Sequence, residues 1–262
     1  MRALYTAATG MAAQELNVQV ISNNIANMRT TGYKKQRAAF QDLIYDHVRR
    51  VGAQASDQGT MIPVGVDIGG GVKTVGTPRM MGQGTLSTTG NDLDVAIRGE
   101  GFFKIQMTDG TFTYTRDGSF STDSQGRIVN AQGNLLQPTI TVPTAASQLT
   151  INAAGQVSVI VPGSTTPTVL GSIGLTRFIN KAGLNPIGDN LFTETPASGP
   201  PQDGTANLDG FGDMQQRNLE QANVEVVTEI SDLIAAQRAY EMNAKVISAA
   251  DQMLQSTSGM FR

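Results

Sequence analysis

Apolar residues recur at every seventh position near the C-terminus. This column comprises Leu219, Val226, Leu233, Tyr240, Ile247 and Leu254. A second column near the N-terminus comprises Leu4, Met11, Val18 and Ile25, with Ile21 beside it. A seven-residue repeat places its members in one stripe along an α-helix, and such a stripe favours packing against another helix. The two columns therefore predict helices over residues 4–28 and 216–255, which we interpret as surfaces for assembly.

The middle of the chain has a different pattern. All ten prolines lie between Pro63 and Pro201, and most glycines fall in the same region. Because proline interrupts helices and glycine favours turns, this region predicts short strands. Asp109-Gly110, between two apolar runs, is a typical hairpin turn. We expect an antiparallel β-sandwich or barrel-like domain across about residues 67–205.

The predicted fold class is therefore α+β. Long N- and C-terminal helices would form a coiled-coil-like assembly domain, with a central antiparallel β-rich domain between them. The predicted parts are residues 1–39, 40–66, 67–212 and 213–262. Residues 40–66 are compatible either with a helix and a loop or with an extended ribbon, because their apolar spacing is helical at first but Gly52 to Gly59 is polar.

Charge favours contact between the two ends of the chain. The net charge is −3, which argues against a nucleic-acid-binding protein, since such proteins normally carry a basic face. Residues 1–45 carry five basic and two acidic side chains, whereas residues 213–262 carry four basic and seven acidic ones. Exposed ion pairs contribute only ~0–1 kcal/mol each, so the apolar stripes must dominate the association.

The sequence offers no catalytic constellation. It contains no cysteine, which excludes thiol chemistry and disulfides, and His47 is its single histidine. The glycine-rich runs at 69–71 and 99–101 do not complete a phosphate-binding motif. Nothing fixes the mutual distances of the carboxylates Asp92, Asp94, Glu100 and Asp109. We therefore predict neither an enzyme nor a cofactor or metal site.

No apolar run is long enough for a membrane span or a cleaved secretory signal. We expect no membrane insertion, and any export would proceed without such a signal.

Polar residues interrupt both helical patterns. Near the N-terminus they are Asn17, Asn23, Asn24 and Asn27; near the C-terminus an alternate column reads Asn223, Ile230, Gln237, Ala244 and Asp251. A polar residue at a helix seam costs stability but specifies register. The first group could bond to neighbouring subunits or simply face solvent, and the second could align the helices or contact a third helix.

Several segments resemble the bacterial flagellar rod and hook axial family. The terminal ones are residues 26–34 (ANMRTTGYK), 219–224 (LEQANV) and 236–243 (AQRAYEMN); the central ones are 89–97 (TGNDLDVAI), 101–103 (GFF) and 114–120 (YTRDGSF). Within the family the chain is most similar to distal rod members, with proximal rod members as the alternative. Ala222 departs from the pattern, since the family often has Ser there.

The resemblance implies a structural subunit of a hollow helical drive shaft in the flagellar basal body. Such a shaft would cross the periplasm, carry motor torque to the hook and provide the export channel. Implied partners are copies of the chain in an open helical polymer, proximal rod proteins, hook protein, surrounding periplasmic and outer-membrane ring proteins, and the export apparatus. The extended segment that follows the N-terminal helix would keep the shaft straight.

The stripes and the resemblance together define a candidate assembly interface. Its residues are Leu4, Met11, Val18, Ile21, Asn24, Ile25, Asn27, Gly32, Tyr33, Lys34, Leu219, Asn223, Val226, Ile230, Leu233, Gln237, Arg238, Tyr240, Glu241, Asn243, Ile247 and Leu254. We expect the terminal helices to be largely disordered in the monomer and to fold on assembly. A competing hypothesis is a secreted β-rich binding module oligomerised through its terminal helices.

Overall fold

The chain is organised as two compact units in a computed structural model that describes residues 2–49, 64–146, 148–162 and 166–260. The terminal unit comprises Met1–Ile25, Gln36–Pro78 and Glu225–Arg262. The central unit comprises Ala26–Lys35 and Arg79–Val224. Each unit is therefore built from segments that are distant in the sequence.

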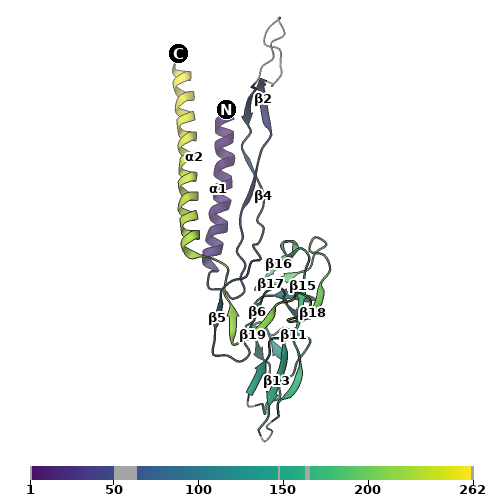
Figure 1. Cartoon of the computed structure of the whole chain (residues 1–262). Helices are drawn as coiled ribbons and strands as arrows, with labels where there is room; N and C mark the ends of the chain where they lie inside the picture. The colour runs from purple at the N-terminus through teal and green to yellow at the C-terminus, as the bar shows by residue number, and fades with distance from the viewer. Residues whose placement is uncertain (1, 50–63, 147, 163–165, 261–262) are drawn as a thin grey trace. The chain divides into compact units, whose positions relative to one another are not determined.

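Two long helices form part of the terminal unit. α1 spans Arg2–Ala26 and α2 spans Val226–Met260 (Figure 1). The prediction that the second helix begins at residue 216 was wrong. The residues before Val226 instead contain β19 (Asp213–Gln216) and β20 (Asn218–Glu220), so Leu219 belongs to a strand and not to a helical stripe.

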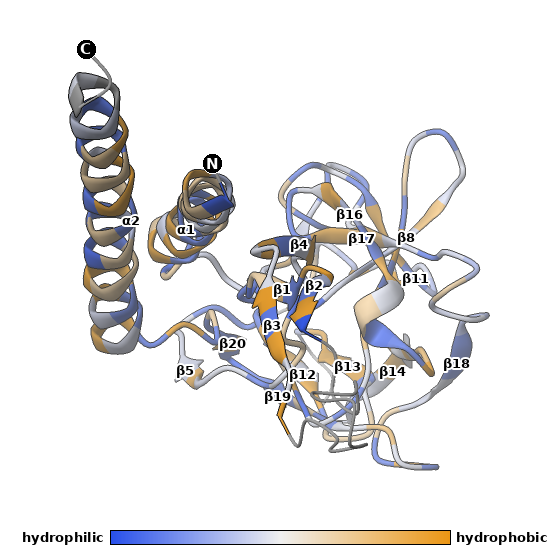
Figure 2. Cartoon of the chain, turned by 90° about the horizontal axis from the view of Figure 1, so that it is seen from above, coloured by the Kyte–Doolittle hydropathy of each residue, from blue (hydrophilic) through white to orange (hydrophobic). Residues whose placement is uncertain are grey.

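An extended ribbon completes the terminal unit. β1 (Ala39–Asp42) pairs with β4 (Val72–Gly76), and β2 (Tyr45–Arg49) pairs with β3 (Val66–Gly69), both antiparallel. The described part of residues 40–66 is therefore a ribbon and not a helix, while Gly52 to Gly59 lie outside the described residues. Figures 1 and 2 both show the ribbon on the side of α1 that faces away from α2.

The central unit is antiparallel and β-rich. Its largest sheet has the strand order β16-β17-β8-β7-β11-β10-β9, and a second sheet has the order β12-β13-β14. The strands of the large sheet are β7 (Phe103–Gln106), β8 (Phe112–Thr115), β9 (Ser121–Thr122), β10 (Ile128–Val129), β11 (Leu135–Gln137), β16 (Asn185–Gly188) and β17 (Leu191–Thr193). Those of the second are β12 (Gln148–Ile151), β13 (Gln156–Ile160) and β14 (Thr168–Ser172).

Smaller antiparallel pairs surround these sheets. β6 (Val95–Arg98) pairs with β19, β5 (Leu86–Thr88) with β20, and β15 (Gly174–Arg177) with β18 (Gln202–Thr205). A short 3-10 helix, η1, spans Lys181–Gly183. The α+β class is confirmed, and the hairpin predicted at Asp109-Gly110 joins β7 to β8. β3 and β4 pair within the terminal ribbon and are not part of these sheets.

Two hydrophobic clusters form the core of the central unit. The larger is mainly aliphatic and includes Val95, Ile97 and Phe103. The smaller consists of Phe102, Tyr114, Phe178, Leu184 and Phe192. Phe102 meets Phe178 and Phe192 edge to face, and Tyr114 meets Phe178 in the same way with ring centroids 4.7 Å apart. The central unit thus has an apolar core of its own.

Candidate assembly interface and the junction beside it

The seam between α1 and α2 includes several small and polar side chains. The buried residues of α2 are Glu229, Ala236 and Ala250, seven and fourteen residues apart. Asn24 Nδ2 on α1 donates a hydrogen bond to Glu229 Oε2 at 3.1 Å. At Gly10, an added Cβ would lie 2.9 Å from Asn243 Nδ2. Gly10 precedes Asn24 on α1 by as many residues as Asn243 follows Glu229 on α2. The two helices therefore run antiparallel, and their register is the same at both contacts.

Asn24 fixes one end of this seam. Its side chain is buried, its Oδ1 accepts a hydrogen bond from the backbone N–H of Gln36, and its Nδ2 donates to the Gln36 carbonyl, both at 2.9 Å. Together with the bond to Glu229, these contacts tie α1 to α2 and to the segment that enters the ribbon. Asn24 was predicted as an interface residue on its polarity, and the structure gives it partners within its own chain.

Much of the apolar surface of α2 faces away from the seam. Its exposed large apolar side chains are Val226, Val227, Ile230, Ile234, Tyr240, Met242, Val246, Met253 and Leu254. Of the predicted stripe, Leu233 and Ile247 are half-buried, whereas Val226, Tyr240 and Leu254 are exposed. Single exposed apolar residues are normal, but a series along one helix marks a surface that binds something.

The remaining predicted helical residues lie around this surface. On α1, Ile21 is buried, while Leu4, Met11, Val18 and Ile25 are half-buried. On α2, Gln237, Arg238 and Glu241 are exposed, and Asn243 is half-buried at the seam. The structure therefore brings part of the predicted set together between the helices and leaves part of it on the outer face of α2.

Gly32, Tyr33 and Lys34 are buried inside the central unit, just after the helical turn that contains Asn27. Gly32 has a φ of +69°, and an added Cβ would lie 2.7 Å from the backbone nitrogen of Asp117. Only glycine fits this close approach with this backbone conformation. These residues contact their own chain, so any effect that they have on assembly would be indirect.

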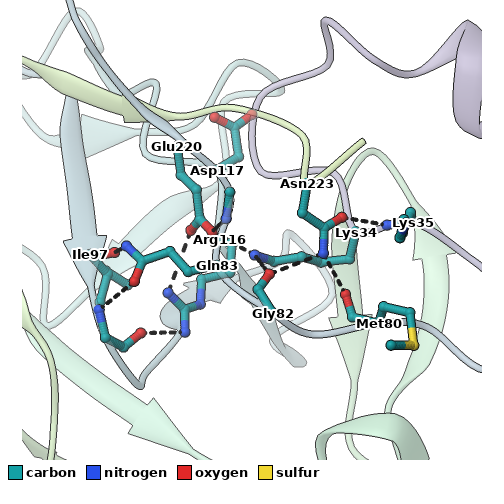
Figure 3. Close-up of polar contacts among 12 residues, drawn as sticks. Lys34, Lys35, Met80, Gly82, Gln83, Ile97, Arg116, Asp117, Glu220 and Asn223 are labelled. Atoms are coloured by element: carbon teal, nitrogen blue, oxygen red, sulfur yellow. Dashed lines mark hydrogen bonds and ion pairs between the residues drawn. The ribbon is translucent and has the colours of Figure 1, made fainter. Parts of the chain in front are cut away.

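A buried charge cluster lies next to this segment (Figure 3). Lys34 Nζ donates to Glu220 Oε1 at 2.5 Å and to the Gly82 carbonyl at 2.9 Å. Arg116 Nη1 lies 3.4 Å from Glu220 Oε2, and its Nη2 donates to the Gly99 carbonyl at 2.7 Å. We call Lys34, Arg116 and Glu220 the junction cluster, because it joins the segment after α1 to the segment before α2.

Burial dominates the electrostatics of the junction cluster. Desolvation lowers the pKa of Lys34 and that of Arg116, and the nearby Glu220 carboxylate opposes both shifts. Glu220 also accepts a hydrogen bond from the Gly84 backbone at 2.8 Å, and the Glu220 carbonyl accepts one from Gly32 N–H at 2.7 Å. One carboxylate thus offsets two buried cations, and the cluster depends on that single anion.

Asn223 makes a second connection at the same junction (Figure 3). Its Oδ1 accepts a hydrogen bond from the Lys35 backbone at 2.8 Å, and its Nδ2 donates to the carbonyls of Met80 (2.7 Å) and Gly82 (3.0 Å). The expectation that Asn223 lies in a helix seam was wrong, because it precedes α2. Sequence reasoning also missed Arg116, although it falls in the family-like segment 114–120.

Within the described ranges, no group of three or more His, Cys, Asp or Glu side chains is arranged to hold a metal ion. Neither α1 nor α2, over its described residues, contains an apolar stretch long enough to span a bilayer.

Three family models match the chain in order. Residues 4–34 match the flagella basal body rod protein model, residues 96–159 the flagellar hook protein FlgE/F/G D1 domain, and residues 215–260 the flagellar basal body rod FlgEFG protein C-terminal region. The first and third models cover most of both helices, and the second covers β6 to most of β13.

Full-length relatives agree with these matches. The flagellar basal-body rod protein FlgG of Caulobacter vibrioides is 53% identical over 98% of both chains. The protein of the same name from Agrobacterium fabrum is 47% identical over 97% of both chains. In contrast, the flagellar basal-body rod protein FlgF of C. vibrioides is 32% identical, covering 97% of this chain and 95% of its own.

The chain therefore belongs to the flagellar basal-body rod protein family. It is a structural subunit of the distal rod, located in the basal body of the flagellum, and not an enzyme.

Proposed function

We propose that the chain polymerises through its terminal unit into a hollow helical drive shaft. The shaft would transmit motor torque across the periplasm to the hook and enclose the export channel. Membership of the rod family implies that the chain polymerises with copies of itself and that other rod and hook components are its neighbours. The observation that carries the proposal is the number of large apolar side chains that α2 and the ribbon expose, because an extended exposed apolar surface is typical of a binding interface.

The proposed interface comprises the outer face of α2 and the predicted residues on α1. Contacts between different surfaces of identical subunits do not close into a dimer, so repeated addition produces an open polymer. We further propose that the terminal helices order fully only on docking, which would limit premature polymerisation. Proximal rod proteins, hook protein, ring proteins and the export apparatus are proposed as the other partners, on family membership alone.

A charged substitution on α2 tests this proposal. Tyr240 is 43% exposed on α2, and Tyr240→Asp places a carboxylate in the proposed interface. We expect loss of rods in electron micrographs and loss of swimming when the variant is the only copy in the cell. Leu233→Asp, at a half-buried position of the same stripe, should act similarly.

The matched control is Leu208→Asp, because Leu208 is 60% exposed but lies in the central unit. This variant should assemble and swim normally. Normal swimming by Tyr240→Asp cells would refute the proposed interface. A wild-type protein that forms only a discrete dimer or trimer in sedimentation experiments would instead favour the binding-module hypothesis.

A further inference from the structure

An apolar groove lies between the beginning of α1 and the ribbon, within the terminal unit. It has a volume of about 510 Å³ and is lined by Tyr5 and Thr6 of α1 and by Ile44, Tyr45 and Ile68 of the ribbon, with Arg2 and Asp46 also on its wall. Ile44 is 89% exposed, and Tyr5, Tyr45 and Ile68 are also exposed. Within the described part of the terminal unit, these side chains are not covered.

A second uncovered apolar segment lies at the end of α2. The register of the helix pair, Asn24 with Glu229 and Gly10 with Asn243, places Arg2 opposite Asp251. Residues 252–260 therefore extend beyond the start of α1, as Figure 1 shows, and we call them the overhang. The overhang contains no charged residue, and its Met253 and Leu254 side chains are exposed.

The groove and the overhang cannot meet within one subunit. α1 lies between α2 and the ribbon in Figures 1 and 2, so the two surfaces are on opposite sides of the terminal unit. Both lie at the same end of that unit, because the groove includes the first turns of α1 and the overhang extends past them. Neighbouring copies placed side by side would therefore bring one surface against the other.

We propose that the overhang of one copy docks into the groove of the next copy. This inference rests on the proposed polymerisation and names the surfaces that perform it. The described overhang is uncharged, and the two charged side chains on the groove wall, Arg2 and Asp46, form an ion pair with each other, so the contact would join two mainly apolar surfaces. Because the two surfaces differ, a pair of copies still has one free groove and one free overhang. Each added copy can therefore bind another, which gives an open polymer.

Cross-linking between single-cysteine variants tests the contact directly, since the chain contains no cysteine. Full-length Ile68→Cys and Met253→Cys proteins are mixed, polymerised and treated with a short thiol-reactive bismaleimide. We expect a cross-linked dimer containing both variants in the polymer and none in the unpolymerised mixture. The matched control pairs Met253→Cys with Ile179→Cys, an exposed isoleucine of the central unit, and should give no dimer.

A second pair of variants gives an independent readout. Ile44→Asp should reduce polymer yield at least tenfold, because it places a carboxylate in the groove. Ile179→Asp should not change the yield, since Ile179 is 77% exposed in the central unit. Neither side chain is packed in its own subunit, so both variants should fold.

The results separate this inference from the proposed function. If polymers form from the cysteine variants without the Ile68–Met253 cross-link, or if Ile44→Asp polymerises normally, the groove contact is wrong although polymerisation stands. If the wild-type chain does not polymerise under any condition in which its relatives do, the proposed function fails as well.

Discussion

The two units of the chain differ in how far they bury their large apolar side chains. The central unit places them in two internal clusters, and Phe103 and Ile105 are completely buried. The terminal unit buries small and polar residues at its helix seam, and it carries most of the large apolar side chains that are exposed. One unit therefore has the core of an independent domain, whereas the other exposes apolar surface that we propose its neighbours cover.

The sharpest test of this contrast is a pair of truncations. Phe103→Ala in the central core should lower the free energy of unfolding by about 3–5 kcal/mol, because it leaves a cavity among packed side chains. Ile234→Ala on exposed α2 should change the same quantity by no more than about 0.5 kcal/mol in the monomer, yet weaken polymerisation. Urea titrations followed by circular dichroism measure the first quantity, and sedimentation of polymer measures the second.

If Ile234→Ala destabilised the monomer as strongly as Phe103→Ala, the terminal unit would have a core of its own, and the contrast would be lost.

The junction cluster should be the most sensitive polar site of the central unit. Glu220→Gln removes the carboxylate that pairs with both Lys34 and Arg116, which remain buried. We expect a loss of about 3–5 kcal/mol in unfolding free energy, as for other buried ion pairs that lose one partner. The same urea titration measures it.

Asp92→Asn provides the control for Glu220→Gln. Asp92 pairs with Arg217 on the surface at 2.6 Å, and both side chains are substantially exposed. Its loss should cost only about 0–1 kcal/mol. Equal effects of the two variants would mean that burial does not determine the strength of the cluster.

A smaller effect is expected at the helix seam. Asn24→Ala removes the side chain that bonds to both backbone groups of Gln36 and to Glu229, and leaving those buried groups unsatisfied costs about 1–3 kcal/mol. If the helices order on assembly, the cost should appear as a lower melting temperature of the polymer. Ser22→Ala, at an exposed position of the same helix, should leave that temperature unchanged. A melting temperature unaffected by Asn24→Ala would show that the seam does not form in the polymer.

The sequence predicted the elements whose signals are local. The absence of proline from both ends gave the helices, and Asp109-Gly110 gave the β7–β8 hairpin. The sequence-based prediction failed where pairing with a distant segment determines the secondary structure. Leu219 fits the seven-residue column of the helix, but its segment pairs with β5 as a strand. The sequence left residues 40–66 open between a helix with a loop and a ribbon, and pairing with β3 and β4 decides for the ribbon in their described part.

Among the functional surfaces, too, only those with a local sequence signal could be predicted. Three exposed residues of α2, Val226, Tyr240 and Leu254, belong to the predicted seven-residue column, which is a local pattern. The junction cluster has no such pattern, because Lys34 and Glu220 are 186 residues apart and no spacing rule connects them. The groove likewise requires α1 and the ribbon to be adjacent, which only the folded chain reveals. The division of the chain at residues 39, 66 and 212 stays a prediction.

The central claim is that other copies cover the apolar surface of the terminal unit, and hydrogen exchange tests it most directly. Amides of α1 and α2 should exchange rapidly in the monomer and become strongly protected in the polymer, whereas those of β7 and β8 should be protected in both. Equal protection of both helices before and after polymerisation would contradict the account.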